Sequence, residues 1–146
     1  MNTMKRRDFL RSSCISCVGA AALGVSLVEL SSCSPALPTY KTSFKGNTID
    51  VPVASFGESN LLIIRDMQVE FDILLVRKSA EDYRAIYMKC SHRSNPVSAT
   101  ATGLYCPSHG STFDLDGNVL KEPATAPLQK FKTQLNNQTI TITLNL

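Results

Sequence analysis

Two short stretches decide how this 146-residue chain is interpreted: KCSHRSN at residues 89–95 and YCPSHGSTFDLDG at residues 105–117. The chain holds two histidines, and each lies within three residues of a cysteine in one of these stretches. Cys90 and His92 form the first pair, and Cys106 and His109 form the second pair after 13 intervening residues. Each stretch therefore offers one thiolate and one imidazole from a tight turn, the ligand types that a metal centre needs.

Two simple interpretations of these residues explain the pattern only in part. A structural zinc site usually takes its cysteines as one close pair and its histidines as another, whereas this chain alternates cysteine and histidine in both stretches. A disulfide between Cys90 and Cys106 would suit an exported protein, but it leaves the positions of both histidines unexplained. Both alternatives remain open at the level of the residues alone.

The same residues resemble the Rieske family, whose members carry a 2Fe-2S cluster with two thiolates on one iron and two imidazoles on the other. KCSH and YCPSHGSTFDLDG carry the resemblance, which runs from Cys90 to about Leu128. It implies that Cys90 and Cys106 hold the inner iron and that His92 and His109 hold the exposed iron. Because neutral imidazoles reduce the negative charge of the centre, such a cluster has a higher reduction potential than an all-thiolate one.

Some positions depart from the high-potential members of that family. Those members carry a further cysteine in each loop, joined as a disulfide, where this chain has Asn95 and Ser108. The resemblance therefore implies that Pro107, Gly110 and the packing of the flanking strands hold the loops in place.

Neighbouring residues imply how the potential of a cluster would be tuned. Ser111 resembles the family serine whose hydroxyl donates to a bridging sulfide, although it could simply cap a turn. Phe113 stands where high-potential members have a tyrosine that donates to a cysteine sulfur, and phenylalanine has no donor. This predicts a potential in the lower or middle part of the Rieske range of roughly −150 to +300 mV. Residues 122–128, EPATAPL, resemble the proline-rich loop that covers the cluster, with an ordinary turn as the alternative.

The chain after residue 34 has the pattern of an all-β domain. Its short apolar runs are separated by turn residues, and none keeps a 3.6-residue period. The clearest expected strand is 139–144, where isoleucine or leucine alternates with threonine, and Asn136-Asn137 and Asp116-Gly117 predict hairpin turns. The resemblance implies a Rieske-like antiparallel β-sandwich with a small cluster-binding subdomain, residues about 88–128, formed by two loops. The other expected strands are 48–53, 61–65, 69–77, 84–89, 113–115 and 128–133.

The first 33 residues are predicted to be a signal peptide or membrane anchor. They begin with the basic stretch KRRDFL, continue with 15 uncharged residues from Cys14 to Val28, and end in small residues before Cys33. A membrane-spanning helix needs roughly 20 apolar residues, and Glu29 interrupts any extension of this run. KRRDFL resembles the twin-arginine signal, which directs bacterial proteins across the cytoplasmic membrane already folded.

The end of this segment resembles a lipobox, LSSC at residues 30–33, which predicts lipidation of Cys33. The alternative is that Cys33 is an incidental thiol and that the leader stays uncleaved as a short anchor. Both alternatives place the body of the protein outside the cytoplasm, in the periplasm or another extracytoplasmic space, and attached to the membrane. Residues 34–47, which begin with SPALP, are expected to be a linker to the Rieske domain at 48–146.

Composition and charge exclude several classes of function. The chain is 43% hydrophobic and 18% charged, as expected for a single globular domain. Its net charge is +3, but four basic and two acidic residues lie in the first 33 positions, so the remaining residues are close to neutral. These residues also lack a basic stripe that could bind nucleic acid. A Rieske oxygenase needs further histidines for a second iron, and this chain has none to spare. No catalytic triad or phosphate-binding loop is present in the sequence.

We therefore expect a one-electron carrier that has no catalysis of its own and serves as a subunit of a redox complex. One setting that the resemblance implies is a quinol-oxidising complex, although the missing disulfide argues against it. Another is an exported molybdenum oxidase such as arsenite oxidase. A third is that of a free ferredoxin that serves an oxygenase. The leader argues against this one, because those ferredoxins work in the cytoplasm. The alternative from a different class is an exported zinc-stabilised β-domain that acts as a non-redox binding module.

Overall fold

The computed structural model of the chain describes residues 36–43 and 46–146, which belong to one compact unit, Pro35–Leu146. The twin-arginine-like stretch, the apolar run and the lipobox with Cys33 lie outside the described residues. Within the described ranges, no helix is long and apolar enough to cross a membrane.

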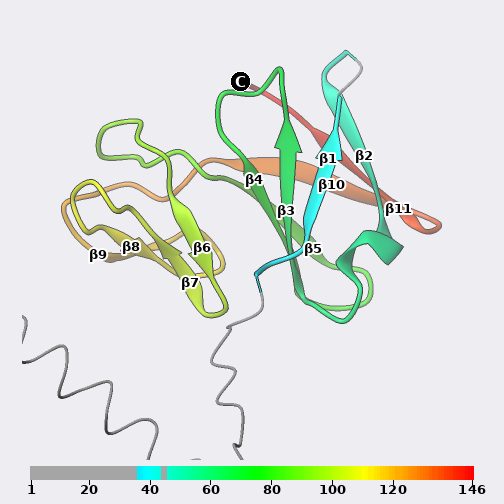
Figure 1. The fold of residues 1–146 in the computed structure, drawn as a ribbon, viewed down its shortest axis with the longest axis horizontal. Helices are drawn as coiled ribbons and strands as arrows, with labels where there is room; N and C mark the ends of the chain where they lie inside the picture. Colours follow the sequence, from blue (N-terminus) through cyan, green and yellow to red (C-terminus); the bar gives the residue numbers. More distant parts are fainter. Residues whose placement is uncertain (1–35, 44–45) are drawn as a thin grey trace, which may run out of the picture. The chain divides into compact units, whose positions relative to one another are not determined.

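The larger of two sheets has seven strands in the order β1-β3-β4-β5-β10-β11-β2 (Figure 1). Its pairs are antiparallel except for β1 and β3, which run parallel. β10 joins the two halves of the sheet, because its first residues pair with β5 and the rest pair with β11. A short 3-10 helix, η2, follows β2 at Val53–Phe56. The strands are β1 (Thr39–Thr42), β2 (Thr48–Pro52), β3 (Leu61–Asp66), β4 (Ile73–Arg77), β5 (Tyr83–Tyr87), β10 (Lys130–Asn136) and β11 (Thr139–Thr143).

The smaller sheet has four strands in the order β6-β7-β8-β9, and Figure 1 shows it beside the larger sheet in yellow-green and yellow. All four lie between β5 and β10 in sequence, and β5 and β10 pair with each other in the larger sheet. The smaller sheet is therefore an insertion between two neighbouring strands. Both cysteine–histidine stretches, 89–95 and 105–117, fall inside the segment that is inserted between β5 and β10. Its strands are β6 (Ser98–Thr100), β7 (Gly103–Tyr105), β8 (Thr112–Phe113) and β9 (Val119–Lys121).

The all-β prediction is confirmed, with differences in detail. The expected strand 139–144 appears as β11, and the two predicted hairpin turns join β10 to β11 and β8 to β9. The expected strand 69–77 begins only at Ile73, because a turn occupies the preceding residues. Sequence reasoning missed β6, β7 and β9, which are too short to show a period. It also missed β1, which lies within the expected linker and pairs with β3 at the sheet edge.

Two hydrophobic cores lie on opposite faces of β4 and β5. Side chains alternate between the faces along a strand, so Ile73 and Leu75 belong to the first core and Leu74 and Val76 to the second. Because both faces of β4 are covered, its sequence is an almost unbroken apolar run. The second core continues into the smaller sheet and holds both cysteines there. It contains Leu61, Leu74, Val76, Ile86, Met88, Cys90, Val97, Leu104, Cys106, Phe113, Ala124 and Leu128.

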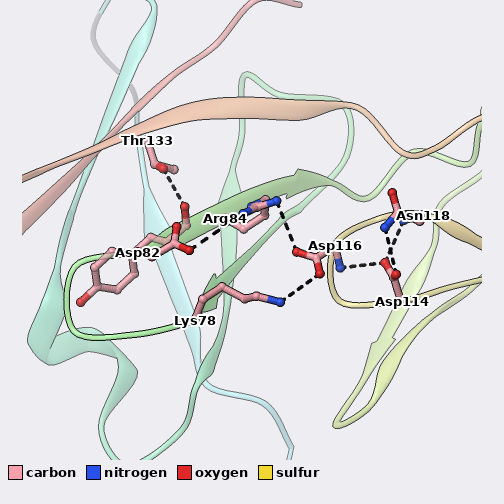
Figure 2. A network of polar contacts seen from close by, with 8 residues as sticks. Lys78, Asp82, Arg84, Asp114, Asp116, Asn118 and Thr133 are labelled. Carbon is pink, nitrogen blue, oxygen red and sulfur yellow. Dashed lines mark hydrogen bonds and ion pairs between the residues drawn. The ribbon is translucent and has the colours of Figure 1, made fainter.

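A polar network ties the β8–β9 turn to the β4–β5 hairpin (Figure 2). The carboxylate of Asp116 lies 3.0 Å from Lys78 Nζ and 3.3 Å from Arg84 Nη1. Asp114 shapes the turn itself, because it accepts hydrogen bonds from the backbone N–H groups of Asp116 and Asn118, both at 2.8 Å. The ion pairs are about one-third exposed, so each contributes at most about 1 kcal/mol. Their main effect is to fix where the turn sits on the larger sheet.

The pKa of Asp114 lies below its ordinary value. Burial of the carboxyl raises the pKa, but hydrogen bonds from Asn118 and Asp116 and the charge of Lys130 outweigh it. A carboxyl with a depressed folded-state pKa stabilises the fold above its unfolded pKa of about 3.9, and this contribution is lost as the pH falls through the folded value.

We expect an Asp114→Asn variant to unfold at a lower temperature than the unmodified protein at about pH 7. The gap should shrink as the pH falls through the lowered folded-state pKa, because below that value the carboxyl is protonated in both states of the unmodified protein. Thermal unfolding at a series of pH values measures the gap, with the exposed Glu58→Gln as the control. A gap that stays constant with pH would contradict the prediction.

Candidate metal centre

The two loops that carry the predicted ligands have the same backbone form. In the first loop, the N–H of Ser94 donates to the carbonyl of Cys90 at 2.8 Å, and in the second the N–H of Gly110 donates to the carbonyl of Cys106 at 2.9 Å. Each cysteine N–H donates in turn to the carbonyl five residues later, at 2.8 Å in both loops. Ser94 and Gly110 both take a positive φ, 48° and 81°, which allows these turns to close. Gly110 therefore has a structural reason to be glycine.

The two cysteines meet beneath these turns. Cys90 is 2% exposed and Cys106 is 0% exposed, both are free thiols, and their side chains lie close enough for each to shift the pKa of the other. The structure therefore contains no disulfide between them. The backbone N–H groups of His92 and Arg93 point at the sulfur of Cys90, and those of Ser108 and His109 point at the sulfur of Cys106. Converging N–H groups suit sulfur atoms that carry negative charge.

The surroundings shift the pKa values of the two thiols in opposite directions. Burial raises the pKa of Cys90 despite its backbone donors. Burial also opposes ionisation of Cys106, but the Ser108 N–H, the Cys90 thiol, the His109 N–H and the Ser108 hydroxyl together outweigh it and hold the pKa of Cys106 below its ordinary value. Ser108, one of the positions where high-potential proteins carry a disulfide cysteine, thus contributes a hydroxyl to the sulfur environment.

The two imidazoles meet on the outer side of the loops. The rings of His92 and His109 lie edge to face, with 5.0 Å between their centroids. His109 is exposed and His92 is partly buried. Nδ1 of His92 is buried and has no hydrogen-bond partner among residues 36–43 and 46–146. A buried polar atom without a partner destabilises a fold by about 1–3 kcal/mol, and a bound metal would remove this deficit. The residues present therefore fit a metal centre.

The arrangement favours a centre with two metal atoms over a single zinc ion. Two thiols lie together on the inside and two imidazoles lie together on the outside.

The other predicted site residues surround this centre. Ser111 is fully buried, and its Oγ accepts the N–H of Ala124 at 2.9 Å, which leaves the hydroxyl proton free to be donated elsewhere. Phe113 is 1% exposed and packs in the second core, where it offers no donor. Pro107 lies exposed at the tip of the second loop.

The proline-rich loop, residues 122–128, bridges the two cysteine–histidine loops. The N–H of Ala124 donates to Ser111 of the second loop, and Ala126 accepts a 2.6 Å hydrogen bond from the Ser91 hydroxyl of the first loop. At its end, the N–H of Leu128 donates to the carbonyl of Gly117 at 2.8 Å. Sequence reasoning missed Ser91, because nothing in a serine beside a cysteine indicates which distant carbonyl it contacts.

Comparison with known proteins agrees with this geometry. A family model described as the Rieske 2Fe-2S domain matches residues 51–132, more than half of the chain. The cyanobacterial plasma membrane Rieske protein PetC3 from Synechocystis PCC 6803 has a similar structure, with 23% identity, a TM-score of 0.56, and coverage of 66% of this chain and 99% of that one. Among curated proteins, no sequence matches the chain significantly.

Two further solved structures share the fold at lower identity. The ferredoxin of carbazole 1,9a-dioxygenase from Nocardioides aromaticivorans is 17% identical, with a TM-score of 0.50 and coverage of 68% of this chain and 100% of that one. A chain of a hyperthermophilic respiratory Complex III is 13% identical, with a TM-score of 0.50 and coverage of 94% of this chain and 99% of that one. At these identities the likeness concerns the fold.

Proposed function

Because the chain belongs to the Rieske family, whose domain binds a 2Fe-2S cluster, we propose that Cys90 and Cys106 hold one iron and that His92 and His109 hold the other. The observation that carries this assignment is the grouping of the side chains, with two buried thiols together and two imidazole rings 5.0 Å apart. The partnerless Nδ1 of His92 supports it further. When bound, the cluster supplies a one-electron redox couple.

The function that this site supports best is one-electron transfer between two redox partners. The exposed His109 and the partly exposed His92 bring the outer side of the centre to the surface, where a partner can approach closely. The cysteines stay shielded from water in the second core. The chain thus separates a buried inner side, which fixes the cluster, from an outer side that meets partners.

The proposal extends to the location of the protein. The leader, with its paired arginines, its 15-residue uncharged run and Cys33, supports an extracytoplasmic, membrane-attached carrier. We propose a quinol-oxidising complex or an exported molybdenum oxidase as its setting. One neighbour in structure is a plasma membrane protein and another belongs to a respiratory complex, which is compatible with such a setting.

The experiment that tests the function begins with the full chain expressed with iron and sulfide available. We expect two irons and two acid-labile sulfides per chain, and a rhombic paramagnetic resonance signal after reduction with dithionite. A redox titration should give a potential in the lower or middle part of the range of roughly −150 to +300 mV, because Phe113 gives no hydrogen bond to sulfur. One zinc per chain without sulfide would contradict the function, and a potential at the top of the range would contradict the tuning argument.

A further inference from the structure

The two cysteine–histidine loops are joined without a covalent bond. Asn95 and Ser108 occupy the positions where high-potential members of the family have cysteines, so the disulfide that those members form between the loops is absent here. The proline-rich loop makes the connection instead, through one hydrogen bond to each side. The bond to the second loop is buried at Ser111, whereas the bond from Ser91 to Ala126 lies at the surface.

A cavity that is partly open to solvent lies between the first loop and the proline-rich loop. It has a volume of about 260 Å³, and its lining includes Cys90, Ser91 and Ser94 from the first loop and Pro127 from the proline-rich loop. This volume is large enough for several water molecules. Cys90 is only 2% exposed, but it borders this space.

The Ser91–Ala126 hydrogen bond joins the two walls of the cavity. Ser91 is itself a lining residue, and Ala126 immediately precedes Pro127 on the other wall. The bond is 2.6 Å long, at the short end for a hydroxyl donor. Breaking it would release Ala126, an exposed residue, while Ala124 and Leu128 stay anchored on either side.

We propose that Ser91 is a latch that holds the proline-rich loop against the first loop and so restricts the access of water and chelators to Cys90. It is a positioning residue, because its hydroxyl contacts a backbone carbonyl and not the ligands. The inference rests on the proposed function, in which Cys90 is an iron ligand. Opening of the loop widens the path from this space to the iron–sulfur bond, so the rate of attack from this side rises with the population of the open form.

The test uses the cluster-loaded full chain with Ser91→Ala, Ser91→Thr and Thr125→Ala. Removing one hydrogen bond to a partly exposed carbonyl should raise the open population about fivefold. We therefore expect Ser91→Ala to lose iron to a ferrous chelator about fivefold faster than the unmodified protein. Ser91→Thr keeps the hydroxyl and should restore the slow rate. Thr125→Ala removes an exposed hydroxyl from the proline-rich loop without touching the latch and should leave the rate unchanged.

A second measurement separates the latch from a general loss of stability. Amide hydrogen exchange in residues 122–128 should speed up in Ser91→Ala, whereas exchange in β11 and the global unfolding free energy should change little. Equal iron-release rates in Ser91→Ala and the unmodified protein would overturn the latch and leave the electron-transfer function standing. The latch would also be overturned if Ser91→Ala lowered the global unfolding free energy by enough to account for the faster release of iron. Failure of the unmodified chain to bind a cluster would instead refute the proposed function.

Discussion

A His92→Ala variant is expected to fold but to lose the rhombic reduced-state signal of the cluster completely. His92 is partly exposed and lies outside both hydrophobic cores, so its loss leaves the packing of the sheets intact. Its Nδ1, however, is a buried atom that has no partner within the part of the protein that the structure describes. Without that nitrogen the outer iron lacks one of its two imidazoles, and the mixed thiolate–imidazole set no longer exists.

Three measurements on one sample establish this result. Iron and sulfide content and the paramagnetic resonance spectrum report the cluster, and far-ultraviolet circular dichroism reports the sheets. The matched control is Arg93→Ala, which removes the adjacent exposed side chain of the same loop while leaving the backbone in place. A variant of His92 that retains two irons and an unchanged signal would refute the assignment of this residue as a ligand.

Gly103→Ala is expected to destabilise the fold by about 3 kcal/mol, the upper end of the usual cost of overpacking. A Cβ at Gly103 would lie 2.5 Å from the carbonyl oxygen of Phe113, which is backbone and cannot rotate away. β7 and β8 would have to separate where Leu104 pairs with Phe113. Because β7 leads directly into Cys106, the shift would also displace a thiol of the site.

Urea unfolding measures this effect, and Thr102→Ala serves as its control. Thr102 is an exposed turn residue immediately before Gly103, so its substitution should change stability by at most about 0.5 kcal/mol. We also expect less cluster per chain in Gly103→Ala than in the control. Equal midpoints for the two variants would show that the β7–β8 pair can move apart freely.

The fold could be predicted where a pattern is contained within a few residues. The threonine alternation of β11 and the turn residues before it are local, and the structure has them where expected. β6, β7 and β9 have three residues each, and their existence depends on neighbours that pair with them. β1 likewise forms at the edge of β3, with which it runs parallel. Such strands leave no period of their own in the sequence.

The ligand types and the form of each loop are specified by local sequence. In each loop the histidine follows the cysteine by two or three positions, and the residue four positions after the cysteine takes a positive φ. These residues form a closed turn within six residues. Spacing of this kind needs no information from the rest of the chain. The family resemblance and the expected cluster therefore follow from these two local motifs alone.

The meeting of three separate segments, in contrast, depends on tertiary packing. The loops at 90–95, 106–111 and 122–128 converge because the second core buries Leu104, Phe113 and Leu128 against β4 and β5. The latch from Ser91 to Ala126 and the ion pairs of Asp116 with Lys78 and Arg84 arise from that convergence. Burial of apolar surface is non-directional, so the sequence indicates that these side chains will be buried without indicating which partners they will meet.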